Sequence, residues 1–318
     1  MKSILQLGLL VIVALTPSIA ARAQREGLVP TQTLVSVDAK STPPASAAAL
    51  TVSVNDHKEP LIAWEPVVPA NAQVALLIDD GLSESVGREL DSLRKFVRAL
   101  PSGVEVLVGF MQYGHVVSQQ PFTADHELAA STLHLPEGLP GMSASPYLCL
   151  SDFVKHWPVA GSSSDGNEIG TSSRHKSRFV LMLSNGVDPY NGSTSIMNQD
   201  SPYVAAAVTD AQRAGVAVYA IYYGAAGMRG DSANNSGQSY LAQLTQGTGG
   251  VNFWQGEGNP VSMAPFLDQF QHAVAETYIA TFDAPIGSHP QRDMVRVKFS
   301  AAKTKLHAPA EVRPGNQE

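Results

Sequence analysis

The chain has 318 residues, of which 44% are hydrophobic and 15% charged, so it can bury a large core in one domain or two small ones. Its formal net charge at pH 7 is -7, and its basic residues are scattered along the sequence, which argues against a nucleic-acid-binding protein. The single cysteine, Cys149, excludes an internal disulfide.

The N-terminus has the pattern of a targeting segment. Lys2 supplies a positive charge, residues 4–15 are apolar, and Ala21-Arg22-Ala23 fits the small-x-small cleavage rule. This pattern predicts a signal peptide over residues 1–23 with cleavage before Gln24, and hence export to the periplasm or the medium. The alternative is an uncleaved membrane anchor. No later stretch is long and apolar enough to cross a bilayer, so we expect no membrane span in the mature chain.

The next two segments differ in composition. Residues 24–48 are rich in Pro, Ser, Thr and Ala, which predicts a flexible linker. Residues 49–70 contain two short arms rich in β-forming residues on either side of the polar run "DHKE". These arms predict a short β segment, either a hairpin or two edge strands.

Strand and helix patterns alternate over residues 72–276. "VALLID" is a continuous apolar run typical of a central parallel strand, and the runs "VEVLVGFM", "RFVLMLS" and "VAVYAIYYG" resemble it. The stripe from Val86 to Leu100 has helical spacing. The alternation predicts an α/β fold with a doubly wound, mostly parallel sheet. Residues 277–315 contain two strands without a helix between them, which predicts a β-rich C-terminal extension beside this domain.

Three loops at the predicted carboxyl ends of strands carry oxygen-bearing side chains. Function in a doubly wound sheet is located at these strand ends. Carboxylates, hydroxyls and amides together are the ligands of a hard cation such as Mg²⁺ or Ca²⁺. The loops contribute Asp79, Asp80 and Ser83; Ser143 and Ser145; and Ser184, Asn185 and Asp188.

At these residues the chain resembles the von Willebrand factor A (VWA) domain family, a Rossmann-like fold, over residues 72–275. The resemblance implies a metal-ion-dependent adhesion site. Its Asp-x-Ser-x-Ser motif would fall on Asp79, Gly81 and Ser83, its middle-loop Thr on Ser145, and its later Asp on Asn185. The flanking β segments are similar to those of a secreted bacterial, acidobacterial-type branch of that family.

Two positions depart from the family pattern. Gly81 lacks the hydroxyl of the first motif Ser, and Asn185 lacks the charge of the later Asp. Both losses weaken a site for a hard cation. Two interpretations therefore stay open: a weak site for Mg²⁺, or for Ca²⁺ or Mn²⁺, and a vestigial site that holds no ion. Further ligand candidates are Ser143 in place of Ser145, and Asp80 or Asp188 as a compensating carboxylate.

Each of these residues also has a purely structural explanation. Ser83 and Ser145 each precede a predicted helix, so either could be its N-cap, and Asn185-Gly186 is a common turn pair. Asp79 could be held by backbone amides without any cation.

The sequence lacks the common catalytic motifs. It contains no G-x-S-x-G elbow, no P-loop and no H-E-x-x-H, and Cys149 lies in an apolar helical pattern. We therefore expect a non-catalytic, exported protein that binds a protein ligand through the degenerate adhesion site, with an acidic residue of the partner completing the coordination of the cation. The alternative is a structural or assembly module of the cell envelope with a vestigial metal site.

Overall fold

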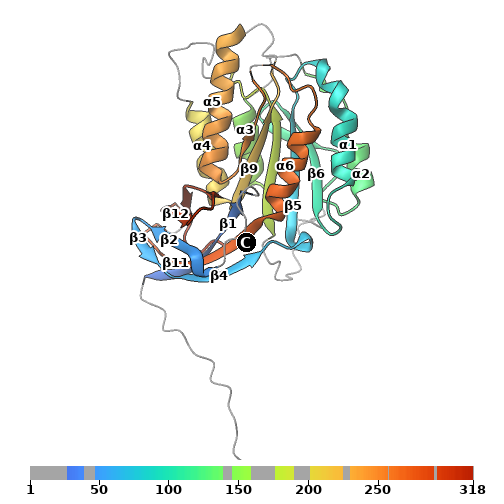
Figure 1. Ribbon diagram of the computed structural model, residues 1–318. Helices are drawn as coiled ribbons and strands as arrows, with labels where there is room; N and C mark the ends of the chain where they lie inside the picture. Colours follow the sequence, from blue (N-terminus) through green and yellow to red (C-terminus); the bar gives the residue numbers. More distant parts are fainter. Residues whose placement is uncertain are drawn as a thin grey trace, which may run out of the picture.

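The computed structural model describes residues 27–38, 47–138, 145–158, 176–189, 201–224, 230–256, 258–289 and 292–317. The predicted signal peptide and its cleavage site lie outside these residues. The chain forms an α/β body that stands on a base of antiparallel strands (Figure 1).

A six-stranded sheet forms the centre of the body. Its strands are β5 (Ala72–Asp79), β6 (Glu105–Gln112), β7 (His115–Ser118), β8 (Ser177–Ser184), β9 (Val216–Tyr222) and β10 (Asn252–Phe253). Their spatial order is β10-β9-β8-β5-β6-β7, and only β7, at one edge, is antiparallel. Counted along the chain within this sheet, that is the order 3-2-1-4-5-6 of doubly wound folds. The predicted fold class is therefore confirmed.

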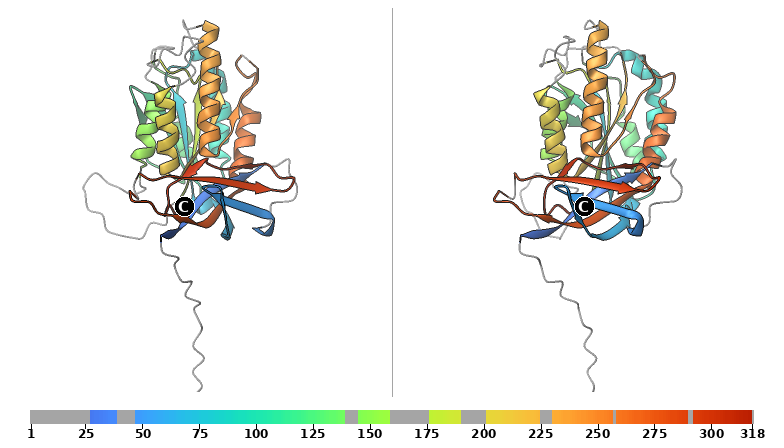
Figure 2. Two further views of the ribbon diagram at one scale, coloured as in Figure 1. Left: turned by 90° about the vertical axis from the view of Figure 1, so that its left-hand side faces the viewer. Right: turned by 60° about the vertical axis from the view of Figure 1, so that its left-hand side comes forward.

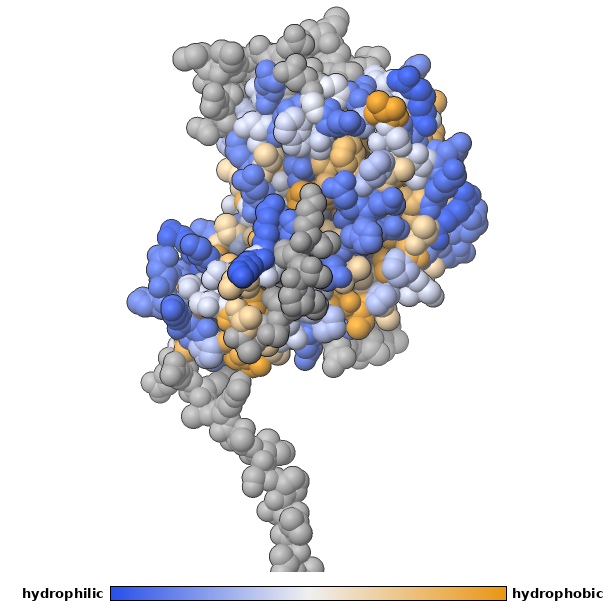
Figure 3. All heavy atoms as spheres, viewed as in Figure 1, coloured by the Kyte–Doolittle hydropathy of each residue, from blue (hydrophilic) through white to orange (hydrophobic). Residues whose placement is uncertain are grey.

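Helices cover both faces of the sheet, as alternating strands and helices require (Figures 1 and 2). One face carries α1 (Leu90–Arg98), α2 (His126–Ser131) and α6 (Ala264–Ala275); the other carries α3 (Pro146–Lys155), α4 (Pro202–Arg213) and α5 (Gly230–Thr248). The predicted stripe from Val86 begins as a 3-10 turn, η3 (Glu84–Glu89), before α1. The outer face of α1 is largely hydrophilic (Figure 3), because its apolar stripe faces the sheet.

The base consists of two four-stranded sheets built from both ends of the chain. Their orders are β13-β1-β11-β4 and β14-β12-β2-β3. The strands are β1 (Leu28–Val37), β2 (Leu50–Val54), β3 (His57–Glu59), β4 (Leu61–Pro66), β11 (Thr277–Pro285), β12 (Val295–Ala301), β13 (Leu306–His307) and β14 (Glu311–Val312), with short 3-10 turns η1 (Ala47–Ala49) and η2 (Pro69–Asn71). Residues 49–70 thus contain both a hairpin, β2–β3, and an edge strand, β4, of the other sheet.

The predicted flexible linker over residues 24–48 is wrong for its central part. Strand β1 lies between β13 and β11, pairs with β11 from Leu28 to Ser36, and buries Leu34 and Val35. The prediction was based on the composition of residues 24–48 as a whole, and the Pro- and Ala-rich run after residue 38 masked the β-forming run "LVPTQTLVSV". The paired residues of β11 lie about 240 to 260 positions further along the chain, so no local pattern could indicate the pairing.

The path of the chain defines two ends of the body. Strand β5 rises out of the base after β4, and α6 returns to the base at β11, so the parallel strands start near the base (Figure 1). Their carboxyl ends lie at the opposite end, which we call the loop face. None of the helices in the described residues is long and apolar enough to cross a membrane.

Candidate functional site at the carboxyl ends of the strands

The loop face centres on the point where the strand order reverses. Neighbouring strands β5 and β8 are both followed by crossovers, but in opposite directions along the sheet. Ligands of doubly wound folds bind in the crevice at such a point. Strand β5 ends at Asp79 and β8 ends at Ser184, one step beyond the paired residues Ile78 and Leu183. The sheet register therefore places Ser184 directly beside Asp79.

Asp79 is buried, with 2% of its surface exposed, and both of its carboxylate oxygens accept hydrogen bonds from the protein. The backbone N–H of Gly81 donates to Oδ1 at 2.9 Å, and the Ser184 hydroxyl donates to Oδ2 at 2.7 Å. The Ser184 oxygen in turn accepts from the Gly186 N–H at 2.9 Å. A buried carboxylate needs such donors, because an unpaired buried charge is strongly unfavourable.

Asn185 uses its side chain to shape its own loop. Its Oδ1 accepts from the Val187 N–H at 2.8 Å, which closes an Asx turn. Gly186 then adopts φ +69°, a conformation that favours glycine. A Cβ on Gly237 of α5 would lie 2.1 Å from the Asn185 carbonyl oxygen, so α5 packs backbone to backbone against this turn. The turn pair predicted at Asn185-Gly186 is present.

Ser83 lies at the start of η3 but does not cap it through its side chain. Its hydroxyl is 2.6 Å from the Ser85 hydroxyl, which is 3.0 Å from the Tyr223 hydroxyl just beyond β9. These contacts tie the loop after β5 to the end of β9.

Ser145 is fully buried at the start of α3, and no described residue forms a hydrogen bond with its hydroxyl. It is the N-cap residue by position, but its side chain makes no capping bond. One turn into the helix, the Tyr147 hydroxyl donates to the Gly186 carbonyl at 2.7 Å. Burial raises the pKa of Tyr147 well above its usual value, and the nearby charges of Asp188 and Asp79 raise it further. The start of α3 therefore closes over the loop after β8.

The two further carboxylates serve neighbouring segments. Asp188 is buried and accepts from the Ser201 hydroxyl at 2.6 Å, and Ser201 caps α4. Asp80 Oδ1 accepts from the Glu137 N–H at 2.8 Å and so holds the segment after α2. Ser143 lies outside the described residues.

Most of the predicted ligands within the described residues already form hydrogen bonds with the protein. Mg²⁺ and Ca²⁺ need about six or more oxygen ligands with free lone pairs directed at one point. Asp79 and Asn185 direct their oxygens at protein N–H and O–H donors, Ser83 pairs with Ser85, and Gly81 offers no side chain. Among the predicted ligands that the structure describes, Ser145 has a hydroxyl without a hydrogen-bond partner in the described residues. Within the described residues, no group of three or more His, Cys, Asp or Glu side chains could hold a metal ion.

Two residues of this face, Tyr147 and Ser201, were not named from the sequence, and Ser184 was named in its loop but not matched to the family motif. Ser184 ends a buried strand one residue before Asn185, so the alternation of side chains along the strand was a usable signal. Tyr147 and Ser201 had no such signal, because each acts through a segment distant in the sequence.

No protein-family model and no curated protein matches this chain. Solved structures similar to it include an aerotolerance-related membrane protein from Bacteroides fragilis, at 10% identity, 64% coverage of this chain, 98% of the other and TM-score 0.40. BatB from Bacteroides thetaiotaomicron is 11% identical, with 64% of this chain and 97% of the other covered and a TM-score of 0.41. The SpRpn10 VWA domain is 10% identical, with 62% of this chain and 93% of the other covered and a TM-score of 0.37. These similarities transfer no function or ligand to this chain.

The doubly wound strand order explains where the polar residues gather. In this strand order the first and fourth strands of the sheet, here β5 and β8, are neighbours whose crossovers diverge, so the loops after them can open a crevice. At the ends of these two strands, Asp79 accepts from the Ser184 hydroxyl and Asn185 accepts from the Val187 N–H.

Proposed function

We propose that this chain is an exported, non-catalytic protein-binding module of the secreted bacterial VWA type, and that its loop face binds the partner without requiring a cation. The observation that carries the proposal is the buried hydrogen-bond network of Asp79, Ser184 and Gly186 at the point where the strand order reverses. This network supports the vestigial interpretation of the adhesion site, because both oxygens of the Asp79 carboxylate already accept hydrogen bonds from the protein.

The chemistry of the face supports binding rather than catalysis. The carboxylate of Asp79 is shielded and already accepts two hydrogen bonds, so it is poorly placed to take a proton from a substrate. Burial raises the pKa of the nearby Cys149 thiol to about 12, which keeps the thiol protonated and unreactive at neutral pH.

Export rests on the pattern of residues 1–23 alone. N-terminal sequencing of protein recovered from the envelope or the medium should begin at Gln24. Recovery of an intact Met1 terminus from the cytoplasm would contradict export without affecting the proposed binding face.

The binding proposal is tested by affinity capture from the envelope fraction of the same organism, in Mg²⁺ and in EDTA. Glu84→Arg reverses an exposed charge directly after the loop that follows β5, and Lys58→Glu reverses an exposed charge on β3 in the base. We expect the wild type and Lys58→Glu to retain the same partner in both buffers, and Glu84→Arg to lose it.

Two other outcomes contradict the proposal. Loss of the partner with Lys58→Glu alone would favour the alternative, an envelope assembly module that pairs through the strands of its base. If the wild type lost the partner in EDTA but kept it in Mg²⁺, the result would support a cation-dependent adhesion site instead.

A further inference from the structure

A polar cavity of about 520 Å³ lies at the end of the body opposite the loop face. Its walls come from four segments: the end of α3, the start of β8, the end of α4, and the C-terminal residues after β14. The amino ends of parallel strands face the base, so this cavity lies between the body and the base. Its volume falls within the range of about 300–1,000 Å³ that is typical of small-molecule sites.

Positive charge predominates in the lining of this cavity. The lining includes five basic side chains and one carboxylate, that of Asp210. The basic residues are Lys155, Lys176, Arg178, Arg213 and Arg313. Glu105 is not part of the lining but forms an ion pair with Lys176. With Glu105 included, five basic groups and two carboxylates give a net charge of +3, whereas the net charge of the whole chain is -7. Like charges held together repel each other, so an anion would stabilise this arrangement.

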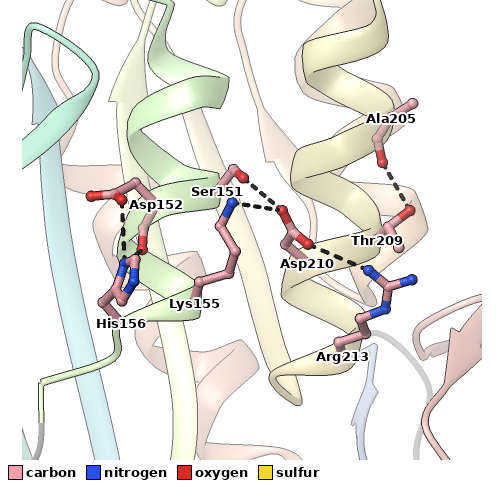
Figure 4. Close-up of polar contacts among 8 residues, drawn as sticks. All are labelled: Ser151, Asp152, Lys155, His156, Ala205, Thr209, Asp210 and Arg213. Atoms are coloured by element: carbon pink, nitrogen blue, oxygen red, sulfur yellow. Dashed lines mark hydrogen bonds and ion pairs between the residues drawn. The ribbon is translucent and has the colours of Figure 1, made fainter. Parts of the chain in front are cut away.

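Asp210 does not neutralise the cavity. Figure 4 shows Lys155 from α3 and Arg213 from α4 directed at its carboxylate. The two contacts are long for ion pairs, at 3.5 Å and 3.7 Å, and the short bond to Asp210, at 2.6 Å, comes from the neutral Ser151 hydroxyl. The Arg213 Nε is buried, and no described residue accepts a hydrogen bond from it. Because neither cation forms a short ion pair with Asp210, both keep donors available for a ligand.

The remaining cations are held in place before any ligand arrives. Arg178 lies over the ring of Trp157, at 5.4 Å from its centroid, and the Trp157 Nε1 donates to Gln73 Oε1 at 2.8 Å. Gln73 in turn donates to Glu105 at 2.8 Å, the same carboxylate that pairs with Lys176. This network fixes the positions of the side chains on the β8 wall, which lowers the entropy lost on binding.

The C-terminal wall is also anchored. The Gly315 N–H donates to Thr31 Oγ1 at 3.0 Å, and the Gln32 N–H donates to the Asn316 carbonyl at 2.8 Å. Strand β1 thereby holds the segment that carries Arg313 across the cavity.

We propose that this cavity binds a compact phosphate-bearing anion. Guanidinium groups offer paired N–H donors that match phosphate oxygens, and lysine ammonium groups add point charges. The site is independent of the proposed partner-binding face, because it lies at the other end of the strands and shares no residue with it.

The test is calorimetric titration of the full chain with inorganic pyrophosphate at low ionic strength. We expect saturable binding with one site per chain. Lys155→Gln with Arg313→Gln should weaken it at least tenfold; Lys155 is at the rim, with half of its side chain exposed, so the fold should tolerate the change. The matched control is Lys95→Gln with Lys298→Gln, which removes two exposed charges outside the cavity and should change the affinity less than twofold.

Three results would overturn the proposal. They are no saturable binding by the wild type, an equal loss in the control variant, which would indicate diffuse surface charge, and equally tight binding of sulfate and chloride. Phosphatidylglycerol vesicles separate a soluble ligand from a lipid headgroup. Binding to vesicles without binding of pyrophosphate would place the phosphate on a membrane surface and overturn a soluble ligand in this cavity. Urea denaturation of each variant checks that it is folded.

Discussion

The hydroxyl of Ser184 donates a 2.7 Å hydrogen bond to the carboxylate of Asp79, and this bond joins the ends of the two strands at which the strand order reverses. The resemblance to the VWA family matched the later Asp of the motif to Asn185, one residue beyond Ser184. Because Ser184 also accepts from Gly186, one hydroxyl connects the loop after β8 to the loop after β5.

Removing that hydroxyl should destabilise the protein. Ser184→Ala takes away the donor to one oxygen of a buried carboxylate, and we expect the free energy of unfolding to fall by about 1–3 kcal/mol. Urea denaturation measures the change. Ser83→Ala is the control, because the Ser83 hydroxyl is only partly buried and bonds to another hydroxyl. Equal losses in the two variants would show that the Ser184–Asp79 bond has no special role.

Divalent cations should leave the stability of the wild type unchanged. A ligand that binds only the folded state at a concentration of 100 times its Kd adds about 2.7 kcal/mol of stability. Melting temperatures in millimolar Mg²⁺ or Mn²⁺ and in EDTA should therefore coincide. A rise with either ion that Asp79→Ala abolishes would support a weak metal site.

Restoring both missing ligands should create metal binding. In Gly81→Ser with Asn185→Asp, the new hydroxyl and carboxylate complete the family motif, so we expect Mg²⁺ to raise the melting temperature. In EDTA the double variant should be less stable than the wild type, because the new carboxylate lies near Asp79 and the two negative charges repel each other. If neither effect occurs, positions 81 and 185 do not face a common site.

A methyl group at Gly237 should displace the turn at Asn185 on the loop face, because α5 packs directly against that turn. The new Cβ would lie 2.1 Å from the Asn185 carbonyl oxygen, so α5 must move away from the turn. We expect Gly237→Ala to reduce the free energy of unfolding by about 1–3 kcal/mol and to weaken partner capture. Gly258→Ala is the matched control, since a Cβ there meets nothing within 4 Å. Full stability and full capture by Gly237→Ala would contradict the close packing.

Cys149 should resist alkylation and contribute a pH-dependent term to stability. Burial raises its pKa from 9.0 to about 12, so iodoacetamide should modify the native protein far more slowly than the urea-unfolded chain at pH 9. The unfolded chain loses this proton first, so the contribution to stability is complete below pH 9 and is lost as the pH rises from about 9 towards 12, by up to about 1.4 kcal/mol per pH unit. Cys149→Ala should show a shallower alkaline decline. Equal slopes would place the thiol in contact with water.

The candidate site was predictable in part. Asp79, Ser83, Ser145 and Asn185 could be placed on the loop face because each follows a buried strand or precedes a helix. Their hydrogen-bond partners could not, since the sequence shows that a carboxylate ends a strand but not which neighbour donates to it. The open choice between a weak and a vestigial site depended on those partners.

The sequence by itself determined the elements of the α/β body and their alternation. Continuous apolar runs such as residues 74–78 and the helical stripe from Val86 are local patterns, and local patterns report which face of an element will be buried. Only the tertiary structure decided what depends on distant pairing. Strand β1 pairs with β11, the Ser184 hydroxyl donates to the Asp79 carboxylate, and four separate segments enclose the cationic cavity. The physical reason is that strand order and register are set by the packing of the whole core, which no window of neighbouring residues contains.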